Sequence, residues 1–254
     1  MTPRGLRSIA VRVAPLAMAA VLLAGCAGAP ATEPTVPPGI DLEGFDGAQG
    51  NGLWLLPGGE LAAEIVDAVR DAGPVHVSGS FTELRQPDPT VEAVRGRSVT
   101  LDYRGRADAF AATVVAGDLE ARVLVEAGSS RVRGNAALAS ALGTPALADA
   151  VVCSVGADPA IDRWAPLLAP VDLVETLLGS TELSVAPPVG DGDTLDVVLG
   201  TDEAPLGVLT VERFGPPLPR SFTAADASGD GVFQFAEWGT APDLAAAAAE
   251  LPCP

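Results

Sequence analysis

The sequence has no lysine, a single histidine and one tyrosine among its 254 residues. It has no Cys-x-x-Cys pair and no second histidine, so the clusters that hold zinc or carry redox chemistry are missing. It also contains no Gly-x-Ser-x-Gly elbow and no phosphate-cradling glycine loop. The one histidine, His76, lies in an alternating segment where a structural role is common. We therefore expect a protein that is not an enzyme and that uses no metal or cofactor.

Positive charge is also scarce. The chain has 15 basic residues, all arginine, against 33 acidic ones, and its formal net charge is −18. This balance argues against binding to nucleic acid and against docking on anionic lipid head groups. The exclusive use of arginine, with abundant Ala, Gly, Pro and Val, is typical of a GC-rich genome such as those of actinobacteria.

No apolar run is as long as the roughly 20 residues of a membrane-spanning helix. The apolar stretch Val13–Ala24 follows Arg4, Arg7 and Arg12 and ends at Leu23-Ala24-Gly25-Cys26. A basic start, a short apolar stretch and small residues at the cut describe a secretory signal peptide. The four last residues also resemble the lipobox of bacterial lipoproteins.

The lipobox resemblance implies cleavage before Cys26 and a diacylglycerol thioether on its sulfur, with further acylation such as palmitate. We expect a signal peptide over 1–25 and an anchor that holds the protein on the extracytoplasmic face of the cell membrane. Each acyl methylene buried in the bilayer contributes about 0.8 kcal/mol. The mature chain is then more acidic than the full sequence, because it loses three arginines and no acid.

Two cysteines remain, Cys153 and Cys253. An even number in an oxidising compartment predicts a disulfide, which would close a loop of about 100 residues. Two buried free thiols are the alternative.

The segment 26–52 is rich in Gly, Pro and Ala and has few large apolar residues, which indicates a flexible tether. Residues 53–254 suffice for one packed domain.

The first part of this domain is predicted to be a helix followed by strands. Helical spacing over Glu60–Ala72 ends at Gly73-Pro74. Alternation typical of antiparallel strands follows, in segments joined by tight turns: Val75–Phe81, Ser98–Arg104, Phe110–Val114, Ala121–Val125 and Ser130–Gly134.

The middle of the chain has helical spacing over Asn135–Leu142 and Pro159–Leu178. Pro166 and Pro170 must break the second stretch, so two short helices are expected there. Strands resume at Thr194–Leu199, Gly207–Phe214, Ser221–Ala225 and Val232–Ala236. Strands, then helices, then strands predict an α+β domain with its helices on one side of a sheet.

One segment near the C-terminus fits the pattern of a calcium-binding loop. Asp226, Ser228, Asp230 and Glu237 fit positions of the EF-hand loop, with Gly231 at its turn. However, prolines precede it and an alternating, strand-like stretch lies within it. The same residues fit a hairpin turn equally well.

The order of these parts resembles the actinobacterial lipoprotein family of LppX, LprA, LprF and LprG, which is related in fold to the LolA/LolB lipoprotein carriers. The likeness begins with the lipobox, the acidic tether and the first helix. It continues through four stretches: Val75–Gly79, Arg131–Asn135, Ala165–Leu173 and Phe233–Gly239.

The resemblance implies a curved antiparallel half-barrel covered by helices, whose apolar hollow carries the acyl chains of a lipid or lipoglycan. An envelope transport protein would then be a possible partner. The apolar residues expected to line the hollow are Val99, Leu101, Tyr103, Phe110, Val114, Val123, Val125, Trp164 and Leu168.

Alternatives stay open at this point. A slip of one residue would turn every strand side chain to the other face. Trp164 and its neighbouring leucines fit a helix over an ordinary filled core as well as a roof over a hollow. The protein would then be an envelope lipoprotein that binds a protein partner on its surface and carries no lipid.

Overall fold

The computed structural model describes residues 47–85, 94–156, 158–179, 182–201, 203–225 and 231–253. These residues belong to one compact unit, Asp41–Pro254, which is distinct from the unit Met1–Ile40. The predicted signal peptide, Cys26 and most of the tether therefore lie outside the described residues. Within those residues, no helix is long and apolar enough to span a bilayer.

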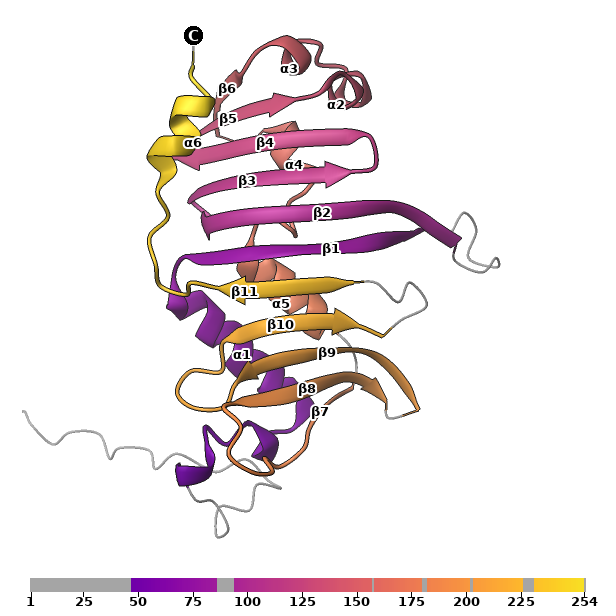
Figure 1. The fold of residues 1–254 in the computed structure, drawn as a ribbon, viewed down its shortest axis with the longest axis vertical. Helices are drawn as coiled ribbons and strands as arrows, with labels where there is room; N and C mark the ends of the chain where they lie inside the picture. Colours follow the sequence, from indigo (N-terminus) through magenta and orange to yellow (C-terminus); the bar gives the residue numbers. More distant parts are fainter. Residues whose placement is uncertain are drawn as a thin grey trace, which may run out of the picture. The chain divides into compact units, whose positions relative to one another are not determined.

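The described chain forms an α+β fold around an open, curved antiparallel sheet, a half-barrel with eleven strands (Figure 1). Their order across the sheet is β6-β5-β4-β3-β2-β1-β11-β10-β9-β8-β7. The strands are β1 (Val75–Arg85), β2 (Val94–Arg106), β3 (Ala109–Ala116), β4 (Leu119–Glu126), β5 (Ser129–Gly134), β6 (Val152–Val155), β7 (Leu183–Val185), β8 (Thr194–Thr201), β9 (Ala204–Glu212), β10 (Pro219–Ala224) and β11 (Val232–Ala236).

Short helices connect and cover these strands. The helices are η1 (Gly47–Gln49), η2 (Leu53–Leu55), α1 (Gly58–Ala72), α2 (Ala136–Leu142), α3 (Ala146–Asp149), α4 (Pro159–Asp162), α5 (Pro170–Leu178) and α6 (Leu244–Glu250). The predicted break in the middle of the chain is confirmed, because Pro170 occupies the first turn of α5, where its missing N–H costs nothing.

Helix α1 begins two residues earlier than predicted and ends where predicted. Gly73 adopts a φ of 81°, a conformation that glycine reaches without strain, and Pro74 then prevents further helix. The side chains at helical spacing, Leu61, Ile65 and Val69, are buried. They join α1 to the inner face of the sheet, where α1 also contacts α5.

The two ends of the domain meet at the centre of the sheet. Strand β1 pairs with β2 on one side and with β11 on the other, and Gly79 is opposite both Leu101 and Phe233. A Cβ atom on Gly79 would lie 2.4 Å from the carbonyl oxygen of Val232, so only glycine fits there. This close approach joins the β1–β6 meander to the β7–β11 meander.

The alternation predicted for the first meander is confirmed, including its phase. Leu101, Val114 and Ala121 share one row across β2, β3 and β4, and all three are buried. Their neighbours along the strands point to the outer face and are exposed on β2 but half-buried on β3. Val123, in the row beside them, has the same inward orientation.

One helix departs from the prediction that all helices lie on one side. Helix α6 crosses β3 and β4 on the outer face, opposite α1, α4 and α5 (Figure 1). There Leu124, which points away from the inner core, is fully buried, and Leu251 is 3% exposed. Arg131 extends across the same face and its guanidinium donates to the carbonyls of Ala248 and Leu251, at 3.4 and 3.3 Å.

Helix α6 was not predicted, because its sequence, LAAAAAE, has no stripe of large apolar side chains. The covalent link that holds it is the predicted disulfide. Cys153, on edge strand β6, is bonded to Cys253, and their Cα atoms are 6.0 Å apart. The C-terminal segment is therefore a strap that crosses the outer face and is fastened at its end.

Removing the disulfide should lower stability substantially. The bridge closes a loop of 100 residues, and chain-entropy arguments give such a loop about 4–5 kcal/mol. We expect Cys153→Ala/Cys253→Ala to lose several kcal/mol of unfolding free energy, measured by denaturant titration. A titration unchanged relative to the parent would contradict the chain-entropy estimate for this bridge.

Candidate functional site

The nine side chains predicted to line a hollow lie together on the inner face of the half-barrel. Eight of them are buried and belong to one continuous core, and Val125 packs against that core. The rings of Tyr103 and Phe110 are 5.0 Å apart, so this part of the interior is packed. None of these nine side chains lines either of the two pockets described below.

Three buried polar atoms in this region have no hydrogen-bond partner within the described residues: the Tyr103 hydroxyl, the Trp164 indole nitrogen and the Ser130 hydroxyl. Burial raises the pKa of the Tyr103 hydroxyl well above its usual value, and the negative charge of Asp108 adds to the effect. The ionised form of this side chain is therefore strongly disfavoured in the folded protein.

An apolar pocket of about 270 Å³ lies between the sheet and α5. Phe81, Phe222 and Phe233 contribute to it from β1, β10 and β11. Leu173 and Leu177, four residues apart on α5, face them. We call this site the acyl pocket, after the ligand class that the family resemblance predicts.

The acyl pocket carries no charge on any of the described residues that line it. Besides the five residues above, these are Thr82, Pro166, Leu167, Thr176, Leu206, Ala224 and Gly231. Leu206 is 51% exposed, so an apolar side chain reaches solvent beside the pocket. The hydroxyl of Thr176 donates to the carbonyl of Asp172 at 2.7 Å and is thus already satisfied.

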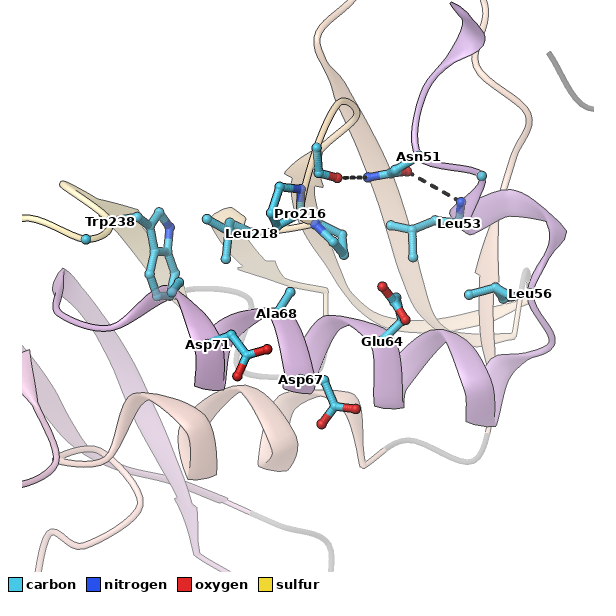
Figure 2. A pocket seen from close by; sticks show the side chains of 15 residues that line it. Asn51, Leu53, Leu56, Glu64, Asp67, Ala68, Asp71, Pro216, Leu218 and Trp238 are labelled. Carbon is cyan, nitrogen blue, oxygen red and sulfur yellow. Dashed lines mark hydrogen bonds between the residues drawn. The ribbon is translucent and has the colours of Figure 1, made fainter. Parts of the chain in front are cut away.

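A larger groove, of about 810 Å³, lies along α1 (Figure 2). One wall is α1 itself, with Glu64, Asp67, Ala68 and Asp71. The facing wall is mostly apolar and comes from three separate segments: Leu53 and Leu56 near η2, Pro216, Pro217 and Leu218 after β9, and Trp238 after β11. We call this site the α1 groove.

The apolar wall of the α1 groove is held by hydrogen bonds. The Asn51 amide donates to the carbonyls of Glu212 and Gly215, at 2.9 and 3.3 Å. The indole nitrogen of Trp238 donates to the carbonyl of Pro219 at 2.8 Å, and its ring stacks on Phe235. The positions of these side chains are therefore fixed by the fold.

Buried Arg213 ties the segments behind this wall together. Its guanidinium donates to the carbonyls of Gln49, Gly190 and Gly192, at 2.5, 2.8 and 2.8 Å. The start of the domain is thus pinned to the end of β9 and to the loop that precedes β8. Three carbonyls satisfied by one planar cation account for its burial.

The calcium motif is mostly outside the described residues, since Asp226, Ser228 and Asp230 all fall in the gap before β11. Glu237 is described, and its carboxylate lies 3.7 Å from the guanidinium of Arg104. In the described part of the chain, no group of three or more His, Cys, Asp or Glu side chains could hold a metal ion. His76 lies 3.3 Å from the carboxylate of Asp102 in the neighbouring strand.

A comparison with solved structures finds a likeness at low sequence identity. The chain is similar to LprF from Mycobacterium bovis in a crystal structure, with 13% sequence identity and a TM-score of 0.39. The match covers 78% of this chain and 98% of that one. No protein-family model and no curated protein matches the sequence.

The sequence prediction missed both pockets. The phenylalanines of the acyl pocket lie on the second meander and at the end of β1, whereas the predicted lining came from the first meander and from Trp164 and Leu168. A usable signal was present in Leu173 and Leu177, which share one face of α5, and in the alternation of Phe233 with Phe235. The α1 groove had no such signal, because its walls come from four distant segments.

Tyr103 gives a spectroscopic test of the packed core, because it is the only tyrosine in the sequence. Its pKa in the folded state is raised above the unfolded value of about 10. Its contribution to stability is therefore complete below pH 10 and is lost as pH rises beyond it. We expect tyrosinate absorbance to appear only with unfolding during an alkaline titration followed in parallel by circular dichroism.

A reversible tyrosinate signal near pH 10, with the circular dichroism spectrum unchanged, would mean that water reaches Tyr103 in the folded protein. The packed description of this half of the interior would then be wrong.

Proposed function

We propose that the protein is a lipoprotein of the cell envelope that binds, and carries, an acyl chain of an amphipathic lipid or lipoglycan in the acyl pocket. The observation that supports this most directly is the uncharged, largely aliphatic and aromatic lining of that pocket, between the sheet and α5. Such a site acts by removing apolar surface from water and needs no catalytic group.

The energetics suit a hydrocarbon ligand. Each methylene that leaves water contributes about 0.8 kcal/mol, so micromolar binding, about −8.2 kcal/mol, needs roughly ten buried methylenes and more once the cost of association is included. No described lining residue carries a charge that could pair with a charged head group, which would remain in solvent beside Leu206. The pocket of about 270 Å³ suits one chain and not several.

The anchor is part of the same proposal. Lipidation at Cys26 and cleavage of 1–25 would hold the domain on the extracytoplasmic face of the membrane, and the part of the predicted tether 26–52 that precedes η1 would connect the two. The disulfide between Cys153 and Cys253 supports an oxidising compartment, since such bonds rarely persist in the bacterial cytosol. A tethered domain with an acyl pocket is positioned to exchange lipid with the membrane that holds it.

Affinity should rise with chain length until the pocket is full. For a series of saturated fatty acids, each added methylene should tighten binding roughly fourfold, since about 0.8 kcal/mol is more than half of a tenfold step. The increase should stop once the chain exceeds the pocket of about 270 Å³. Displacement of a fluorescent fatty acid from the secreted chain beginning at Ala27 measures this.

A substitution that fills the pocket should abolish the effect. Thr176 is exposed on α5 and lines the acyl pocket, so Thr176→Trp adds bulk there without replacing a core residue. We expect it to weaken fatty-acid binding by about tenfold or more, which is about 1.4 kcal/mol or more. The matched control is Glu175→Trp at the neighbouring exposed position, which is not part of the pocket lining.

Equal binding by the Thr176→Trp and Glu175→Trp variants would place the lipid elsewhere. If the parent protein neither binds the probe nor carries co-purifying lipid in native mass spectrometry, the carrier proposal fails as a whole.

A further inference from the structure

The α1 groove is separate from the acyl pocket and has a different chemical character, because one of its walls is acidic and the other apolar. We propose that the α1 groove is the docking site for a basic amphipathic segment of a partner protein. The segment that fits it carries arginine or lysine beside a large apolar side chain.

The acidic wall has the spacing of one helix face. Glu64, Asp67 and Asp71 follow one another at intervals of three and four residues along α1, and all three are exposed. No described residue that lines the groove is basic. Asp67 pairs with Arg70 on the same helix, whereas Glu64 and Asp71 have no ion pair within the described residues. The groove therefore offers two carboxylates to a cation.

Figure 2 shows how the two walls combine. Glu64 and Ala68 rise from α1 toward Pro216 and Leu218, while Asp67 and Asp71 lie along the near side of the helix. An apolar side chain between the walls would thus contact Ala68 and Leu218, with carboxylates within reach of a neighbouring guanidinium or ammonium group. A groove of about 810 Å³ holds several side chains.

The groove is ordered before any partner arrives. Trp238 is fixed by its bond to the carbonyl of Pro219 and by stacking on Phe235. Asn51 fixes the loop at Gly215, and Arg213 fixes the segment that leads to it. Binding would therefore not have to pay for the ordering of this wall, which lowers the entropic cost of docking.

The charge of the groove excludes two other occupants. The chain's own segment 27–46 contains Glu33, Asp41, Glu43 and Asp46 and no basic residue, so α1 would repel it. An anionic membrane surface would be repelled for the same reason. A partner segment with positive charge has the complementary sign, and it meets an apolar wall that a small cation would leave unused.

A peptide-binding experiment tests the proposal on the full lipidated chain in phosphatidylcholine nanodiscs, with empty nanodiscs as the blank. The probe is a labelled twelve-residue peptide of alternating leucine and arginine, and its binding is followed by fluorescence anisotropy. The reference peptides replace either leucine by serine or arginine by glutamate. We expect only the leucine–arginine peptide to bind, and more weakly as salt increases.

Two pairs of variants locate the site. Glu64→Gln/Asp71→Asn should weaken binding about tenfold, as two exposed ion pairs of roughly threefold each would predict. Glu60→Gln/Asp172→Asn removes the same charge from exposed positions outside the groove lining and should leave affinity unchanged. Ala68→Trp should block the groove, whereas Ala63→Trp, on an exposed position of α1 outside the lining, should not.

Several results would overturn the proposal. Equal weakening by both charge-removing pairs would mean attraction by overall charge, and equal binding of the serine–arginine peptide would mean that the apolar wall is not used. Binding unaffected by Ala68→Trp would place the peptide elsewhere. The acyl pocket is tested independently, because Thr176→Trp should leave peptide binding intact and Ala68→Trp should leave fatty-acid binding intact.

Discussion

The pairing of β1 with β11 is the contact on which the architecture depends. It joins strands separated by most of the domain, and it merges two meanders, each formed by local hairpins, into one sheet. Gly79 permits this pairing, because a Cβ atom there would collide with the backbone of β11. Helix α1 leads directly into β1 and lies on the inner face, so its position follows from the same central contact.

The inner face of the half-barrel is packed differently beneath its two meanders. Beneath the first meander, Tyr103, Phe110 and Trp164 belong to a packed core. Beneath the second, α5 leaves an apolar pocket against Phe222 and Phe233. The outer flank of α1 has a third character, with carboxylates facing a fixed apolar wall. One sheet and two helices thus form two cavities whose linings differ in charge.

The C-terminal strap covers part of the outer face. This cover explains the environment of two outward-pointing residues, Leu124 and Arg131. Leu124 points outward and is nevertheless buried, because α6 and Leu251 lie over it. Arg131 lies on the same face and its guanidinium donates to carbonyls near the end of the strap. The disulfide at Cys253 then holds a seven-residue helix that would be unstable alone.

The local elements could be predicted from the sequence: the end of α1 at Gly73-Pro74, the break before Pro170 and the common face of Val99, Leu101 and Tyr103. Backbone geometry and alternation decide these features within a few residues. The packing of distant segments set three other features: α6 crosses the outer face, the predicted hollow residues pack together, and Glu64 and Trp238 line one groove. Such outcomes depend on how side chains from distant segments fill space, and no periodicity in one segment records what packs against it.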